Sequence, residues 1–235
     1  APHRYTANGI YLFKPVVTDD DQGAGSSSMR ITADVAPPET QVSHAGNISL
    51  EAGLPQGASV FLDGAATSLL SAVDPPVNGV AFGVQWTLRR DNSIDGASAL
   101  FTLSNGPFNL PREGVHGLEW FSVDNRGNEE GHKFLTIAVD TTPPVSLLSI
   151  GRPQHRLPDI LLVSSRTPLT IPAFDPVSRE AASGVKDTFY RVSDVTPSAS
   201  PFGTFTTAFT LTAPDAVKLI EFRSRDKVLN TEVVR

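Results

Sequence analysis

Three adjacent carboxylates, Asp19, Asp20 and Asp21, form the densest acidic run in the sequence. Hard cations such as Ca²⁺ bind several oxygen atoms, which adjacent Asp side chains and nearby backbone carbonyls can supply. The spacing differs from that of an EF-hand, which places acidic groups at alternate positions and ends in a Glu. The run therefore predicts either a Ca²⁺ loop or a solvated turn.

A second oxygen-rich stretch contains Asp124 and Asn128, and Asp140 follows it. Asp and Asn side chains accept hydrogen bonds from nearby backbone N–H groups, so this stretch also suits a tight turn. With Asp140 close to a predicted domain boundary, a Ca²⁺ ion bound here would stiffen the junction. Both interpretations remain open.

Catalytic motifs are missing from the sequence. The five His residues are scattered without zinc-ligand spacing, and neither a Gly-x-Ser-x-Gly elbow nor a phosphate-binding glycine loop occurs. We therefore expect a protein that is not an enzyme and needs no cofactor apart from the Ca²⁺ considered above. The formal net charge of −6 and the lack of Lys/Arg clusters argue against nucleic acid as a partner.

The spacing of the other residues predicts an all-β protein. The chain has 235 residues, of which 19 are Pro and 18 are Gly, and these separate short runs rich in Thr, Val, Ile, Leu and Phe. Pro interrupts helices and Gly weakens them, so this pattern favours many short strands. No apolar run approaches the roughly 20 residues of a membrane-spanning helix, and we expect no membrane insertion.

A similar pattern occurs twice, with a period of roughly one hundred residues. The segments 37–40 and 142–145 each begin with a Pro pair or lead directly into one, and the strand-like segments 117–124 and 219–226 each end in Asp. Trp120 and Phe222 occupy equivalent places and should lie in the core. After the Asp, the first copy has Gly127 where the second has Leu229, so the second turn should differ or be strained.

The motifs of the second copy resemble a bacterial immunoglobulin-like repeat of the Asp-Thr-Thr-Pro-Pro type. They are Asp140-Thr141-Thr142-Pro143-Pro144, Ser183-Gly184-Val185, Tyr190-Arg191, and Phe222-Arg223-Ser224-Arg225-Asp226 with Asn230 and Glu232. The resemblance is looser in the first copy. It implies two tandem immunoglobulin-like β-sandwiches, at 36–140 and 141–235, from a secreted or cell-surface bacterial protein.

The first 35 residues differ from both copies. The motifs His3-Arg4-Tyr5, Gly9-Ile10-Tyr11 and Val17-Thr18-Asp19 are similar to the C-terminal half of a polycystic-kidney-disease (PKD) domain, which is also a β-sandwich. So short a segment cannot bury a sandwich core alone. We expect residues 1–35 to be completed by another chain or an upstream part, or else to be a frayed remnant of a longer protein.

These observations favour a structural or adhesive module that spaces or assembles domains, with a filament or larger complex as a narrower version. The alternative is a carbohydrate-binding accessory region of a secreted enzyme, in which Trp86 and Trp120 would be the aromatic candidates for stacking on sugar.

Overall fold

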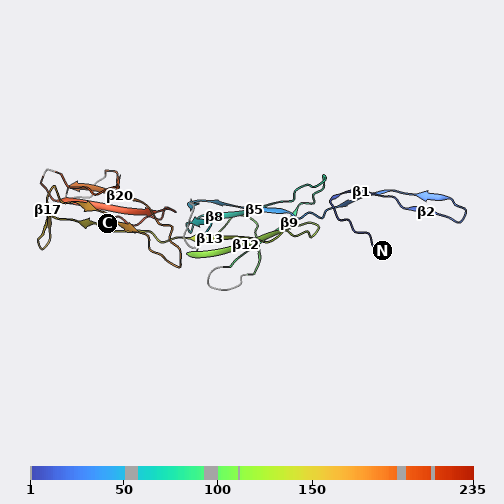
Figure 1. The fold of residues 1–235 in the computed structure, drawn as a ribbon, viewed down its shortest axis with the longest axis horizontal. Helices are drawn as coiled ribbons and strands as arrows, with labels where there is room; N and C mark the ends of the chain where they lie inside the picture. The colour runs from blue at the N-terminus through green and yellow to red at the C-terminus, as the bar shows by residue number, and fades with distance from the viewer. Residues whose placement is uncertain (1, 51–57, 93–99, 111, 195–199, 213–214) are drawn as a thin grey trace. The chain divides into compact units, whose positions relative to one another are not determined.

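The computed structural model describes residues 2–50, 58–92, 100–110, 112–194, 200–212 and 215–235. This part of the chain contains strands, turns and irregular segments but no helix (Figure 1). The all-β class predicted from the Pro and Gly spacing is therefore confirmed. The arrangement in several sheets is compatible with an immunoglobulin-like β-sandwich.

The chain forms two compact units. Unit 1 contains residues 1–44, 67–108 and 117–135, and unit 2 contains residues 45–66, 109–116 and 136–235. Unit 2 therefore includes residues on both sides of position 140. The domain division at 35 and 140 stays a prediction.

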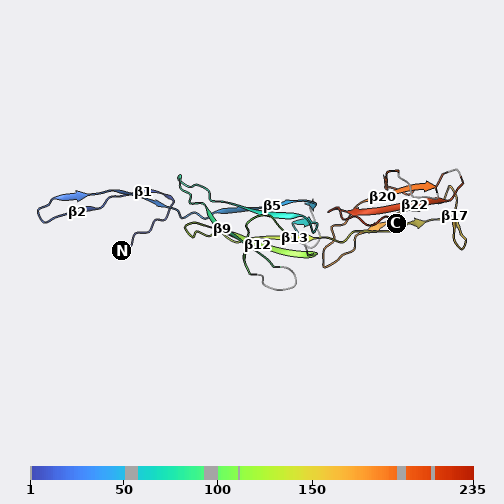
Figure 2. The ribbon, with the colours of Figure 1, turned by 180° about the vertical axis from the view of Figure 1, so that it is seen from behind.

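The N-terminal part of unit 1 is a long hairpin, which contains β1 and β2 in the blue segment of Figure 2. Strand β1 (Gly9–Phe13) pairs antiparallel with β4 (Met29–Ala33), and β2 (Val16–Thr18) pairs with β3 (Ala24–Ser26). Every residue of β2 and β3 is exposed. This hairpin therefore buries little apolar surface of its own.

Nine further strands form two sheets, with orders β11-β8-β5 and β10-β9-β12-β13-β7-β6. Strand β12 pairs antiparallel with β9, and β13 pairs parallel with β7. Strands β12 and β13 contribute residues to both units. The bounds are β5 (Glu39–Ala45), β6 (Ile48–Ser49), β7 (Val60–Leu62), β8 (Thr67–Val73), β9 (Val84–Asp91), β10 (Thr102–Leu103), β11 (Phe108–Asn109), β12 (Gly114–Asp124) and β13 (Lys133–Val139).

The remaining strands belong to unit 2. Three short antiparallel pairs, β14–β19, β15–β18 and β16–β17, accompany a sheet of order β21-β20-β22. The long strands β20 and β22 pair antiparallel (Figure 2). The bounds are β14 (Val145–Ser146), β15 (Ser149–Ile150), β16 (Gln154–Arg156), β17 (Leu161–Val163), β18 (Leu169–Thr170), β19 (Ala173–Phe174), β20 (Val185–Asp194), β21 (Gly203–Thr204) and β22 (Lys218–Asp226).

Both predicted core aromatics are buried, since Trp120 is 5% exposed and Phe222 is 8% exposed. Strand β12 departs from simple alternation, because every residue from Leu118 to Asp124 is buried. Both faces of this strand are covered, so Glu119 lies inside the protein and is only 2% exposed. Trp86 differs from Trp120 and is 41% exposed.

An apolar cluster in unit 2 contains residues from both sides of position 140. Phe61 and Ala138 pack with Ala181 and Val228, and all four side chains are fully buried. Ala58 completes the cluster, and Val115 packs against it. The contacts of this cluster therefore cross the predicted boundary between the two immunoglobulin-like segments.

The turns after β12 and β22 have the same backbone hydrogen bonds. The N–H of Asp124 donates to the carbonyl of Asn128 at 3.1 Å, and that of Asp226 donates to Asn230 at the same distance. The left-handed position is Gly127 in the first turn, with φ 84°, and Leu229 in the second, with φ 70°. Of the two outcomes expected from the sequence, the strained turn is the one found, because a Cβ crowds the backbone in this conformation.

Candidate metal centres

Two groups of three aspartates bring carboxylate oxygens together at the ends of strands. In each group, one ligand oxygen per residue lies within 4.8 Å of the other two. Triad 1 consists of Asp34, Asp74 and Asp124, and triad 2 consists of Asp140, Asp175 and Asp226. All members of triad 1 belong to unit 1 and all members of triad 2 belong to unit 2.

Each triad takes its residues from three equivalent places. The first Asp precedes a Pro pair, at 37–38 or 143–144, and the second Asp directly precedes a Pro, at 75 or 176. The third Asp is the last residue of β12 or β22. The residue before a Pro is held in extended backbone conformations, so the second Asp leaves its strand without entering a helix.

In triad 1, hydrogen bonds occupy one oxygen of each of the first two carboxylates. Asp34 Oδ1 accepts from the side-chain amide of Asn8 at 2.7 Å, and Asp74 Oδ2 accepts from the backbone N–H groups of Phe82 and Gly83, both at 2.7 Å. The other oxygens, Asp34 Oδ2 and Asp74 Oδ1, are buried and have no hydrogen-bond partner. Both residues are more than nine-tenths buried.

Asp124, the third member of triad 1, is held by the turn that follows it. Its Oδ1 accepts from the backbone N–H groups of Arg126 and Asn128, and its Oδ2 accepts from the Asn128 side-chain amide at 2.7 Å. Burial alone would raise the pKa of Asp124, but these hydrogen bonds hold the pKa below its usual value. Asp124 is therefore kept ionised inside the protein.

Asp140, the first member of triad 2, is fully buried and bonds to residues from several segments of unit 2. Its backbone N–H donates to the carbonyl of Leu62 at 2.9 Å, and its own carbonyl accepts from the side-chain amide of Asn230, also at 2.9 Å. Its carboxylate accepts from the backbone N–H groups of Thr142 at 3.1 Å and Ser183 at 2.6 Å. Asp140 thus joins β7, the segment before β14 and the turn after β22.

The environment of the other two carboxylates of triad 2 disfavours their ionised forms. Burial, with a smaller contribution from the charges of Asp140 and Asp226, raises the pKa of Asp175 to about 6. Burial and the Asp140 carboxylate likewise raise the pKa of Asp226 to about 6, against the hydrogen bonds that Asn230 donates to it. A cation between the three carboxylates would remove this penalty.

Two buried oxygens at triad 2 also lack partners. They are Asp175 Oδ1 and Ser183 Oγ. Ser183 is 3% exposed, and its backbone N–H is bonded to Asp140. A buried polar atom without a hydrogen bond is costly, so these oxygens mark places where a ligand would be stabilising.

The ligand atoms of both triads are those that hard cations prefer. Each offers three carboxylates and neither contains His or Cys, which suits Ca²⁺ or Mg²⁺ rather than zinc or copper. Neither triad pairs a Ser, Thr, Cys or Lys nucleophile with an activating base among its members.

The structure separates the metal-binding residues suggested by the sequence. Asp124 and Asp140 belong to different triads. Asn128 lies beside Asp124, and its amide nitrogen donates to Asp124 Oδ2 and to the Asp34 carbonyl. Asp19, Asp20 and Asp21 lie in an exposed turn in which Asp19 accepts from the N–H of Gly23 at 2.6 Å, and they belong to neither triad.

Four triad members were not identified as candidate ligands from the sequence. They are Asp34, Asp74, Asp175 and Asp226. The signal that could have found two of them is the Asp-Pro pair, which occurs at 74–75 and again at 175–176. The equivalence of Asp226 with Asp124 in the repeated pattern could have found a third.

Two buried glutamates hold the first strand of each repeated pattern. Glu130 accepts from the backbone N–H of Thr40 at 3.0 Å and from the Thr40 hydroxyl. Glu232 accepts from the backbone N–H of Ser146 at 3.2 Å and from its hydroxyl, and also from the N–H of Ser224 at 2.8 Å. Because β14 pairs with β19 over only two residues, Glu232 is a principal attachment of that strand.

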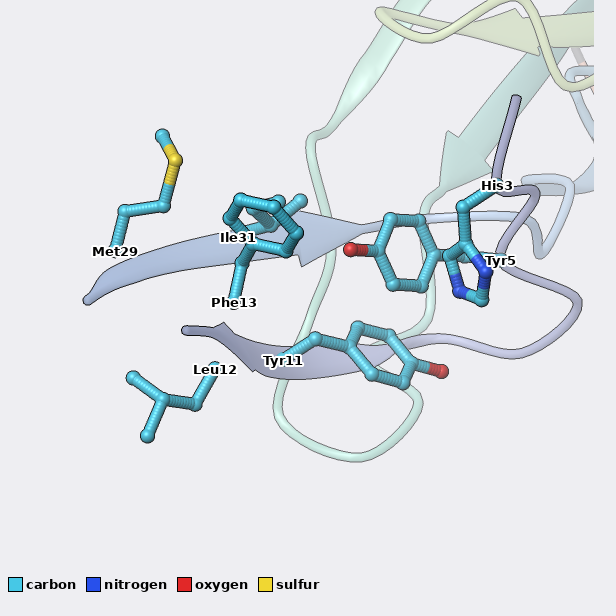
Figure 3. A pocket seen from close by; sticks show the side chains of 7 residues that line it. All are labelled: His3, Tyr5, Tyr11, Leu12, Phe13, Met29 and Ile31. Carbon is cyan, nitrogen blue, oxygen red and sulfur yellow. The ribbon is translucent and has the colours of Figure 1, made fainter. Parts of the chain in front are cut away.

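A second kind of candidate site is the apolar face of the N-terminal hairpin, shown in Figure 3. The rings of Tyr5 and Tyr11 pack at a tilt of 36° with centroids 4.4 Å apart, and the imidazole of His3 packs edge-on against Tyr5. Beyond these rings, Leu12, 67% exposed, and Met29 lie open to solvent. The remaining residues that line this hollow are Phe13 and Ile31.

The chain matches no family model and no curated protein. Across the residues described by the structure, no helix is both long and apolar enough to cross a membrane.

Proposed function

We propose that this chain is a non-catalytic structural or adhesive module of a secreted or surface-anchored bacterial protein, in which tandem β-sandwiches space or assemble domains. The observation that carries the proposal is the buried connection around Asp140. The Phe61–Val228 apolar cluster and the hydrogen bonds of Asp140 both cross the boundary between the two immunoglobulin-like segments. A spacer needs such a junction, because a linker without buried contacts would let its neighbours move freely.

The polar framework of the two segments supports the same role. The Thr87 and Ser122 hydroxyls are 2.7 Å apart between β9 and β12, and the Thr188 and Ser224 hydroxyls are 2.7 Å apart between β20 and β22. These paired hydroxyls lie within the structure and hold neighbouring strands together. We infer that they serve a repeated scaffold.

Spin-label distance measurements would test the stiff junction. The chain has no Cys, so Cys substitutions at the exposed positions Ala45 and Lys186 would be the only labelling sites. A narrow distance distribution is expected for the otherwise unchanged chain, and Phe61→Ala should broaden it by opening a cavity in the junction. A broad distribution in the unchanged chain would contradict the spacer proposal.

The N-terminal hairpin supports an assembly role. We propose that its apolar face, seen in Figure 3, packs against the other half of a PKD-like sandwich, supplied by another chain or an upstream segment. The support is the exposure of apolar side chains on that face, with Met29 at 56% and Phe13 at 48%. Hydrogen exchange over residues 5–34 tests this: fast exchange in the isolated chain is expected, and strong protection in a monomer would contradict it.

Carbohydrate binding is the alternative, and the exposure of Trp86 is the observation that favours it. A flat indole open to solvent can stack on a sugar ring. A glycan array with the unchanged chain and with Trp86→Ala distinguishes the two functions. Glycan binding that disappears in the variant would favour an accessory region of a secreted enzyme, and the absence of binding would favour the structural module.

A further inference from the structure

We propose that each aspartate triad binds one Ca²⁺ ion. The proposal concerns metal binding alone, and it goes beyond the spacer role, since a stiff junction could exist without an ion and an ion could bind without a stiff junction.

Uncompensated charge is the first argument. Three carboxylates converge within 4.8 Å in each triad, and all but Asp175 are buried. Within the described residues, none of the six forms an ion pair with Lys, Arg or His. Buried charges are normally paired or coordinate a metal, because transfer from water is otherwise strongly unfavourable. A divalent cation would neutralise most of the charge of each triad.

Unsatisfied oxygens are the second argument, and they are independent of the charge. Asp34 Oδ2 and Asp74 Oδ1 in triad 1 are buried and accept no hydrogen bond, while the other oxygen of each residue accepts hydrogen bonds from protein N–H groups. At triad 2 the same holds for Asp175 Oδ1, whose partner oxygen accepts from Gly184 at 2.6 Å. In Asp34, Asp74 and Asp175, one carboxylate oxygen is therefore anchored to the protein and the other is available to a ligand.

The anchoring resembles the way protein metal sites are supported. Ligands that bind a metal directly are oriented by hydrogen bonds from surrounding groups. Here the Asn128 and Asn230 side chains each donate to the last Asp of a triad and to the backbone carbonyl of the first, at Asp34 and Asp140. At both triads, one Asn side chain thus supports the first and the last Asp, although the two triads lie far apart in the chain.

Which ion the triads suit is the third argument, because all their ligand atoms are carboxylate oxygens. Without His or Cys the triads do not suit zinc, and Mg²⁺ requires near-ideal octahedral geometry and retains its waters. Ca²⁺ accepts six to eight oxygens in flexible geometry, which carboxylates from three separate segments can provide with backbone carbonyls and water. Each ion would cross-link the segment before a Pro pair to the ends of two strands.

The experiment is Ca²⁺ titration by calorimetry of the full chain near neutral pH, after removal of divalent ions with a chelator. We expect two Ca²⁺ per chain. Asp74→Asn should remove one site and Asp175→Asn the other, because both variants keep an oxygen for the backbone N–H donors while losing the charge that holds the ion. The matched control is Asp20→Asn, an exposed Asp outside both triads, which should retain both sites.

Thermal unfolding gives a second readout that does not depend on the variants. Saturating Ca²⁺ should raise the Tm of the unchanged chain by at least about 5 °C, with Mg²⁺ giving a smaller shift. If about 5 mM Ca²⁺ produces no heat of binding and no Tm shift, the proposal is overturned, since even weak extracellular sites bind below that concentration. Two sites persisting in the Asp74→Asn/Asp175→Asn double variant, folded by circular dichroism, would also overturn it. If the unchanged chain binds only one Ca²⁺, the proposal is overturned for the triad whose Asp→Asn variant still binds that ion.

Discussion

The side-chain amide of Asn230 donates a hydrogen bond to the backbone carbonyl of Asp140 at 2.9 Å. The same amide donates to Asp226 Oδ2 at 2.7 Å, so one side chain joins the turn after β22 to the segment that precedes β14. Asn128 makes the equivalent bonds to the Asp34 carbonyl and to Asp124. Each Asn therefore connects residues about ninety positions apart in the chain.

Removal of this connection should destabilise unit 2. In Asn230→Ala the Asp140 carbonyl and an Asp226 oxygen lose their donor, and we expect the free energy of unfolding to fall by about 2 kcal/mol. Urea unfolding measures the change, and Asn128→Ala should give a similar loss in unit 1. An unchanged urea midpoint in both variants would show that water replaces these bonds at no cost.

Leu229 carries backbone strain that Gly127 avoids in the equivalent turn. Leu229→Gly should raise the free energy of unfolding by about 1 kcal/mol, because glycine has no Cβ to crowd the left-handed conformation. Gly127→Leu is the matched reverse change. It should lose about 1–2 kcal/mol from conformation alone, since a Cβ at position 127 meets no atom within 4 Å. Equal midpoints for the two variants and the unchanged chain would rule out strain.

Glu232 should be among the most sensitive positions in unit 2. In Glu232→Gln, the side-chain NH₂ group must face the backbone N–H of Ser146 or of Ser224, because each carboxylate oxygen accepts from one of them, and we expect a loss of about 3 kcal/mol. The control is Glu129→Gln, whose side chain is 55% exposed and which should change stability by less than about 0.5 kcal/mol. Chemical denaturation of both variants provides the comparison, and equal effects would contradict a structural role for Glu232.

Glu119 should make stability depend on acid pH. Burial would raise the pKa of Glu119, but hydrogen bonds from Arg90, His132 and Asn92, with the Arg90 charge, hold it below its ordinary value of 4.5. The unfolded chain therefore binds the proton more readily, so this contribution is present above pH 4.5 and lost as pH falls through the folded-state pKa.

Comparison with Glu119→Gln isolates that contribution. Near neutral pH the variant should be less stable by about 2 kcal/mol, because a neutral amide replaces the acceptor of Arg90 and His132. The difference between the two proteins should shrink at acid pH, where Glu119 is itself protonated. Urea midpoints recorded from neutral to acid pH would show this convergence, and a constant difference would assign the effect to packing alone.

The pattern of the sequence determined the fold class and the positions of the two equivalent turns. Closely spaced Pro and Gly exclude long helices, and strand periodicity identified Trp120 and Phe222 as core residues. These are local properties, which depend on a residue and its near neighbours. The same local reasoning recognised that Leu229 occupies the place of a glycine.

The tertiary structure alone decided which carboxylates meet. Asp34, Asp74 and Asp124 lie at the ends of strands from three different sheets and converge only because the tertiary fold brings those strand ends together, which no local spacing encodes. The tertiary structure also decided that Glu119 is buried, because residues distant in sequence cover both faces of β12. The densest acidic run, at 19–21, lies in an exposed turn between the exposed strands β2 and β3, where neighbouring carboxylates stay in water.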